Sequence, residues 1–206
     1  MLLILVLTFS VGIAKGQTYT TVDSVGLIVL SKTYSNKDFI KLYNEDGSLW
    51  YRFTYYYDDS DGKFEYANDA FRPFAFHPDY FLLALKCVRK RAGRYEVIVN
   101  EETGLLKYVR SDDSTLRFEP WERHILTVFS VGFDQRVNPI REAPQGALKT
   151  RPLAKVPFHP VEVRGEWLRV RWKPIKGAGK TAAREASGWI RWKRGNKLLL
   201  ELFHIS

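Results

Sequence analysis

Cysteine is nearly absent from this 206-residue chain, and Cys87 stands alone, so no disulfide forms within one molecule. Cys87 lies in the apolar, strand-like run 81–88 with no histidine near it in sequence, which favours a small buried hydrophobe over a nucleophile. The four histidines are scattered, pair with no cysteine and lack metal-ligand spacing, so no zinc site is predicted. These histidines are His77, His124, His159 and His204.

Motifs of enzymes and cofactor sites are missing or incomplete. No Gly-x-Ser-x-Gly elbow occurs. Lys176–Thr181 is similar to the end of a phosphate-binding loop, but Pro174 occupies the position of its first glycine. Asp58–Gly62 is similar to part of a calcium loop, but Tyr57 and Asn68 stand where its first and last ligands belong. The sequence therefore predicts a protein that is not an enzyme and uses no cofactor or metal.

The first residues predict export. Leu2 to Ile13 form an apolar run that is shorter than the roughly 20 residues of a membrane-spanning helix. Small residues in Ala14-Lys15-Gly16 then give a cleavage site before Gln17, so residues 1–16 are expected to be a signal peptide. No transmembrane segment is expected in the mature chain. The alternative is that this run is a buried first strand.

Charge divides the rest of the chain into two unlike parts. Residues 17–136 hold 16 Lys and Arg against 18 Asp and Glu, whereas residues 137–206 hold 15 against 5, a net charge of +10. Such asymmetry indicates two modules, the second facing an acidic partner or surface. We expect domains at 17–133 and 134–206.

Residues 17–133 predict an antiparallel β domain of meander or sandwich type. Strands are expected at 25–30, 49–57, 80–91, 95–99, 105–110 and 124–131. Asp61-Gly62, Ala92-Gly93 and the loop 100–104 supply turns between them. Since 80–91, 95–99 and 105–110 follow one another through short loops, they predict a meander.

Three segments carry the prediction for the second module: Val137–Pro144, Pro160–Trp172 and Ser187–Trp192. Apolar and polar residues alternate on both sides of the Arg164-Gly165 turn, as expected of two antiparallel strands with one buried face. The glycine of Gly188-Trp189-Ile190 permits close backbone approach in a further strand.

These segments resemble the bacterial Src-homology-3-like (SH3b) domain over residues 134–206. Asn138, Arg141 and Pro144 match the opening of that family; Gly165, Trp167 and Val170 match its middle; Gly188, Trp189 and Ile190 match its last core strand. The long insert 173–186 departs from the family, which has a short hairpin there. The resemblance implies a small β-barrel used for binding, often in exported or cell-wall-associated proteins. For the first module no family is recognised.

A basic, aromatic surface on this module is the predicted ligand site. We expect Trp167 and Trp189 in the core, and leave open whether Trp172 and Trp192 are exposed. Exposed tryptophan would stack on a ligand and cations would bind anions. The candidate ligand-binding residues are Arg164, Arg169, Arg171, Trp172, Arg191, Trp192 and Lys193. The alternative is that these charges only solvate the barrel.

The sequence thus predicts an exported, non-catalytic protein of the periplasm or cell envelope that binds a cell-wall component, a peptide, another protein or an anionic surface. Export argues against nucleic acid as the partner, despite the net charge of +9. Two alternatives stay open. One is a cell-wall hydrolase with its chemistry in the first domain, and the other is a purely structural interaction protein.

Overall fold

The computed structural model describes residues 24–35, 37–54, 68–149, 156–173 and 185–205. It is mostly β with antiparallel pairing throughout the named ladders, which confirms the predicted fold class. The expected signal peptide, the Lys176–Thr181 loop and the acidic Asp58–Gly62 turn lie outside the described residues. Among the helices described, none has the length and apolar character needed to cross a bilayer.

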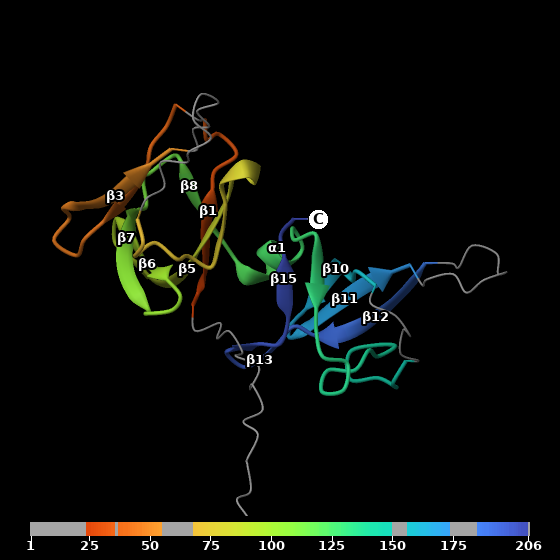
Figure 1. Cartoon of the computed structure of the whole chain (residues 1–206). Helices are drawn as coiled ribbons and strands as arrows, with labels where there is room; N and C mark the ends of the chain where they lie inside the picture. Colours follow the sequence, from red (N-terminus) through yellow and green to blue (C-terminus); the bar gives the residue numbers. More distant parts are fainter. Residues whose placement is uncertain (1–23, 36, 55–67, 150–155, 174–184, 206) are drawn as a thin grey trace, which may run out of the picture.

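The larger sheet is built from the first module, on the left in Figure 1. Its strands run in the order β3-β2-β7-β6-β5-β1-β8, and β4 also pairs with β5. A short 3-10 helix, η1 (Pro78–Tyr80), precedes β5. The strands are β1 (Gly26–Leu30), β2 (Ile40–Tyr43), β3 (Leu49–Phe53), β4 (Ala75–His77), β5 (Leu82–Arg91), β6 (Arg94–Asn100), β7 (Leu105–Arg110) and β8 (Leu116–Glu119).

The predicted meander is confirmed as β5, β6 and β7, which pair in sequence order. Gly93 turns β5 into β6 with a φ of +75°, a backbone conformation that glycine adopts without a steric penalty. Gly104 ends the next loop with a φ of +70°.

The prediction of a strand over residues 124–131 was wrong. A short helix, α1 (Trp121–Ile125), begins after Pro120, and only β9 (Ser130–Gly132) is extended. The first, fourth and fifth residues of α1 are buried, which is the spacing of one helix face. This aromatic and histidine pattern is too short to stand out as helical in the sequence.

The second module contains a three-stranded antiparallel sheet in the order β10-β11-β12. Gly165, at a φ of +56°, forms the expected turn between β10 and β11. The ladders of the described residues do not close into a barrel, so the SH3-like assignment stays a prediction. The strands are β10 (His159–Arg164), β11 (Trp167–Trp172), β12 (Ala186–Arg191), β13 (Lys193–Arg194), β14 (Lys197–Leu198) and β15 (Glu201–Phe203).

Gly188 in β12 allows the close backbone approach that the sequence predicts. A Cβ at this position would lie 2.4 Å from Ile140 Cγ2 and 3.1 Å from the Arg141 carbonyl oxygen. Arg141 and Trp189 exchange both backbone hydrogen bonds, at 2.8 Å each. Glycine thus lets the 138–149 segment lie along β12 and extend the three-stranded sheet.

One apolar cluster continues from the larger sheet into the second module. On β1, Leu27 and Val29 face this cluster, whereas Ile28 faces a second cluster inside the larger sheet. The shared cluster continues through α1 and β9 to the inner face of β11. Figure 1 shows α1 and β15 between the two sheets, and β15 pairs with β9. The expected boundary at residue 133 stays a prediction.

Candidate functional site

The three-stranded sheet has two unlike faces because side chains alternate along each strand. Leu168, Val170 and Trp172 of β11 pack into the shared apolar cluster. The intervening residues, Trp167, Arg169 and Arg171, therefore lie on the opposite face. We call this opposite face, together with its counterparts on β10 and β12, the arginine face.

Strand register brings four of the predicted ligand-binding arginines onto the arginine face. Trp167 of β11 lies between two arginines on the neighbouring strands: Arg191 of β12 pairs with it on one side, and Arg164 of β10 pairs with it on the other. Arg169 lies opposite Trp189. Directly opposite residues share a face of an antiparallel sheet, so Arg164, Arg169 and Arg191 join Arg171 there.

Guanidinium groups cover the two tryptophans of this face. The Arg191 guanidinium lies 4.9 Å from the ring centre of Trp167, and that of Arg164 lies 4.9 Å from the ring centre of Trp189. Both rings are consequently buried, 8% and 7% exposed, although neither belongs to the apolar clusters. Stacking of this kind stabilises both partners and leaves the cations facing solvent.

Trp172 and Trp192 are not ligand-binding surfaces, and including them among the site residues was wrong. They are 4% and 0% exposed and belong to the apolar cluster between the sheets. Trp172 shares strand parity with Leu168 and Val170, which places it on the inner face. The Trp192 indole N–H donates to the Gly165 carbonyl at 2.7 Å, which satisfies its one polar group.

Lys193 lies away from the arginine face. Its Nζ is 3.7 Å from Glu122 Oε1 on α1 and 4.6 Å from the ring centre of Trp192. This lysine therefore links the second module to the helix between the sheets instead of joining the predicted ligand site.

Three carboxylates partly neutralise the arginine face. Glu162 pairs with both Arg164 and Arg169. The other two pairs are Arg191 with Glu166, at 3.1 Å, and Arg171 with Glu185, at 3.7 Å. Partly exposed pairs like these contribute little to stability, on the order of 0–1 kcal/mol each.

A cavity of about 330 Å³ opens at one end of the arginine face, and we call it the arginine pocket. Three guanidinium groups line it beside the buried Trp167. Of these, Arg141 and Arg194 form no ion pair with any described residue, whereas Arg191 meets Glu166. Its lining residues are Val137, Asn138, Pro139, Arg141, Gln145, Trp167, Arg191 and Arg194.

Hydrogen bonds hold the pocket walls in place. The Asn138 amide donates to the Arg191 carbonyl at 2.7 Å and accepts from the Arg191 N–H at 2.9 Å. Arg141 Nη1 donates to the Gly146 carbonyl at 2.8 Å. Asn138 and Arg141, which match the SH3b opening, thus shape the pocket: Asn138 holds the backbone of Arg191, and the Arg141 guanidinium is positioned before a ligand arrives.

No protein-family model, no curated protein and no solved structure matches this chain. The functional argument therefore depends on the side chains and their geometry.

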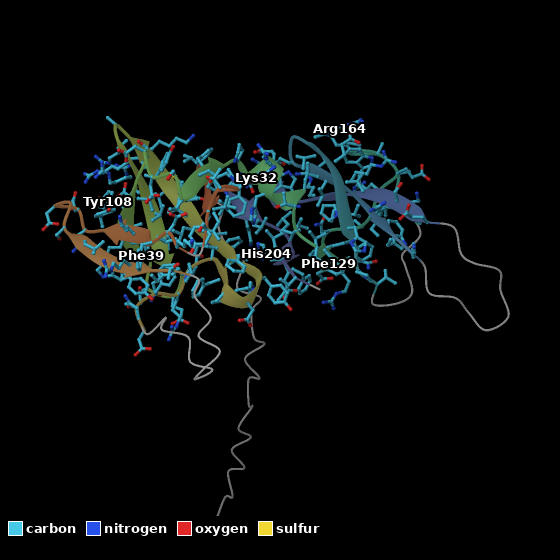
Figure 2. The ribbon with its side chains drawn as sticks, turned by 90° about the horizontal axis from the view of Figure 1, so that it is seen from above. Lys32, Phe39, Tyr108, Phe129, Arg164 and His204 are labelled. Carbon is cyan, nitrogen blue, oxygen red and sulfur yellow. The ribbon has the colours of Figure 1, made fainter. Side chains whose placement is uncertain are left out.

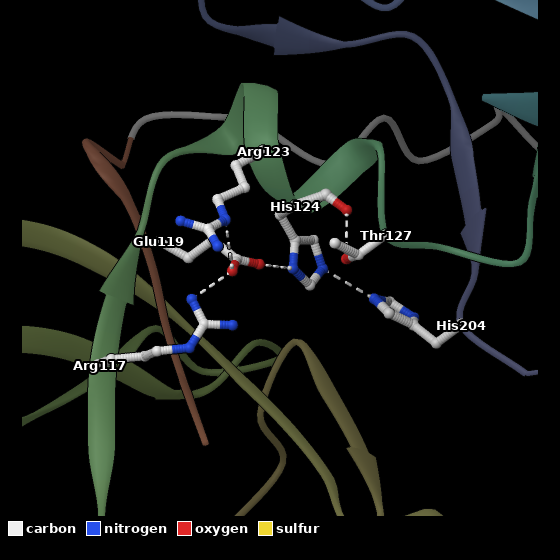
Figure 3. A network of polar contacts seen from close by, with 6 residues as sticks. All are labelled: Arg117, Glu119, Arg123, His124, Thr127 and His204. Atoms are coloured by element: carbon white, nitrogen blue, oxygen red, sulfur yellow. Dashed lines mark hydrogen bonds and ion pairs between the residues drawn. The ribbon is translucent and has the colours of Figure 1, made fainter. Parts of the chain in front are cut away.

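A second polar site lies where the two modules meet, and no sequence motif indicates it. Glu119, at the end of β8, is 2% exposed. Its carboxylate accepts a hydrogen bond from Arg117 and lies 3.1 Å from His124 Nδ1, to which it is also hydrogen-bonded. Arg123 Nε lies 3.8 Å from the same carboxylate. His124 Nε2 in turn meets His204 Nε2 at 3.0 Å (Figure 3).

Burial controls the protonation of this histidine pair. Desolvation lowers the pKa of His124, against the opposing effect of Glu119. Desolvation, with His124 and His77 nearby, lowers the pKa of His204 to about 4. Both rings are therefore neutral at pH 7. Within the described residues no set of three histidine, cysteine or acidic side chains has the geometry to hold a metal ion.

The single thiol belongs to neither site. Cys87 is fully buried, as the sequence predicts, and desolvation raises its pKa to about 11. Its Sγ lies 3.6 Å from the Arg89 carbonyl. The thiol is therefore protonated at neutral pH and packs as an apolar side chain.

Proposed function

We propose that this chain is an exported, non-catalytic binding protein of the cell envelope, and that its second module binds acidic ligands at the arginine pocket. The observation that carries the proposal is the convergence of Arg141, Arg191 and Arg194 on one cavity of about 330 Å³. A guanidinium group matches carboxylate and phosphate oxygens through paired hydrogen bonds. The +10 charge of residues 137–206 adds long-range attraction for anions.

The pocket favours binding over chemistry. Its polar groups are guanidinium and amide side chains, which donate or accept hydrogen bonds but neither attack a substrate nor exchange protons near pH 7. Glu166, a carboxylate beside the pocket, is engaged by Arg191 and by the Gly195 N–H at 2.7 Å. Glu119 and His124, the buried carboxylate–histidine pair of the first module, do not line this pocket.

Calorimetry with a short acidic peptide, acetyl-Ser-Glu-Ser-Glu-amide, tests the proposal at 20 mM and at 300 mM salt. We expect binding at low salt that weakens strongly at high salt, because salt screens exposed charges. Arg194→Gln should lower the affinity about tenfold, since it removes one charged hydrogen-bond partner. The matched control is Lys32→Gln, which changes the net charge equally in the exposed turn after β1. Absence of binding at low salt would overturn the proposal.

Export has its own test. If residues 1–16 are a cleaved signal peptide, mass spectrometry of the protein recovered outside the cytoplasm should place its first residue at Gln17. Retention of Leu2–Ile13 in that material would contradict the cleavage, and recovery from the cytoplasm alone would contradict export.

A further inference from the structure

The arginine face continues beyond the arginine pocket to a second cavity of about 340 Å³. Two cations of β11 and its continuation, Arg171 and Lys173, line this cavity, which we call the distal pocket. Arg171 shares the outer parity of Trp167, so both pockets open onto the arginine face. The lining residues are Pro157, His159, Arg171, Lys173 and Glu185.

A row of cations joins the two pockets. Arg169, Arg171 and Lys173 recur every second residue on the outer side, which spaces them about 6.6 Å apart along the strand. Arg191 continues the row into the arginine pocket, because it lies opposite Trp167. The distance from Trp167 to Arg171 along β11 is about 13 Å.

The geometry points to an extended acidic peptide as the ligand, with carboxylates on alternate residues and a length that reaches both pockets. This inference rests on the proposed function of the arginine pocket. In an extended peptide, as in β11, side chains on one side recur every two residues. Carboxylates on alternate residues of the peptide therefore have the same spacing as the cations along the whole row. The occupants of the distal pocket would be the carboxylates at the far end of that peptide.

Neighbouring strands of the protein already show this arrangement. β10 is itself extended, lies beside β11, and places the Glu162 carboxylate 3.7 Å from Arg169. Glu185, just before β12, lies 3.7 Å from Arg171 in the same manner. Carboxylates on extended chains therefore fit these arginines, and an acidic peptide would exchange with them.

Single-stranded nucleic acid fits this face less well. Proteins that bind it without sequence preference stack successive bases on exposed aromatic rings. Trp167 and Trp189, the tryptophans of the arginine face, are covered by Arg191 and Arg164. Within the described residues the face thus offers charge at a regular spacing but no open tryptophan ring for a base.

Three synthetic peptides test the inference by calorimetry at low salt. One carries four alternating Ser-Glu units, the second carries two such units, and the third has four adjacent glutamates followed by four serines. We expect the four-unit alternating peptide to bind about tenfold or more tightly than either of the others, because it reaches both pockets in register. Equal affinity of the two four-glutamate peptides, or of the long and short alternating peptides, would overturn the inference.

Two variants locate the extra affinity. Arg171→Gln/Lys173→Gln should abolish the gain of the long peptide over the short one, and should weaken the short one only as much as an equal loss of charge elsewhere does. Lys32→Gln/Lys41→Gln is that charge-matched control in the first module and should reduce both peptides equally. Glu185→Gln should tighten the long peptide, since it frees Arg171 from its carboxylate; no change there would contradict the inference even if the double variant fails to fold.

The outcomes separate this inference from the proposed function. If the short peptide fails to bind, the arginine pocket itself is wrongly assigned. If the short peptide binds but added length brings no gain, only the extended ligand is wrong. A pentathymidylate with four phosphodiesters serves as the probe for nucleic acid, and binding as tight as that of the long peptide would overturn the choice of peptide.

Discussion

His124 and His204 meet with their Nε2 atoms 3.0 Å apart, although 80 residues separate them in the chain. His124 extends from α1, and His204 follows β15. Glu119 bonds the opposite nitrogen of His124 at 3.1 Å, so the three side chains form a line from β8 to the end of β15 (Figure 3). Figure 2 shows Arg164 at an edge of the second module and His204 near the middle of the molecule, between the two modules.

The free energy of unfolding should decrease as the pH is lowered from 6.5 to about 4, because His204 is partly buried. Unfolded His204 has its ordinary pKa near 6.5, whereas in the folded protein desolvation, with His124 and His77 nearby, lowers its pKa to about 4. Between these pH values His204 binds a proton in the unfolded chain but stays neutral in the folded chain, which favours unfolding. Below pH 4 both states are protonated, so no further stability is lost. His204 is only partly buried, so we expect a loss on the order of 1–2 kcal/mol.

Urea unfolding at a series of pH values measures this loss. His204→Asn should flatten the dependence between pH 6.5 and 4, apart from the part due to His124. Gln145→Asn, in the loop after Arg141, removes no titratable group and is the control, so it should keep the slope of the unmodified protein. An unchanged slope in His204→Asn would contradict the assignment.

Glu119→Gln should destabilise the protein by about 2 kcal/mol, because it leaves Arg117 and the buried His124 without their anionic partner. The exposed ends of Arg117 and Arg123 reduce this cost below that of a fully buried pair. Glu122→Gln on the surface of α1 makes the same chemical change and should alter the free energy of unfolding by less than about 0.5 kcal/mol. Equal effects of the two substitutions would contradict the role of Glu119.

Gly188→Ala should destabilise the second module by about 1–3 kcal/mol, since its methyl group would overlap Ile140 Cγ2. Ile140→Ala removes that carbon and should also be destabilising on its own, because Ile140 is 1% exposed. The double variant should be more stable than the sum of the two single effects predicts. Strict additivity in thermal or urea unfolding would show that the contact is not the cause.

Much of the fold could be predicted from the sequence because its strands carry local signals. The alternation around Arg164-Gly165 predicts the β10–β11 turn, and the glycine at position 188 predicts a close backbone approach, whose partner, the segment at Ile140, only the structure identifies. The same alternation predicts that Arg169 and Arg171 share a face. α1 was missed because five residues give too few turns for a helical period to emerge from a largely β pattern.

The parts that could not be predicted depend on contacts distant in sequence. Trp192 is buried because apolar residues of both modules pack together in the shared apolar cluster, and the residues next to Trp192 in sequence do not indicate this packing. Likewise His204 lies just after β15 and reaches His124 where β15 pairs with β9, a contact between segments distant in sequence. The arginine pocket could not be predicted without the register between β11 and β12, which places Arg191 beside Trp167.

Arg191→Lys tests the geometry of the arginine pocket at constant charge. Lysine cannot keep both the stacking on Trp167 and the bond to Glu166, so affinity for the short acidic peptide should fall about tenfold. Iodide should also quench tryptophan fluorescence more strongly, since Trp167 loses its cover. Unchanged affinity and quenching would show that charge alone matters at this position.

The pairing of β9 with β15 has a practical consequence for anyone who divides this protein. A fragment starting at residue 134 would keep β15 but lose its neighbour, and Leu202 would lose the strand that it now faces at Val131. The bare edge would then be free to recruit a second chain, so such a fragment should self-associate in gel filtration. An expression boundary before Trp121 retains α1 and β9, and with them the intact edge.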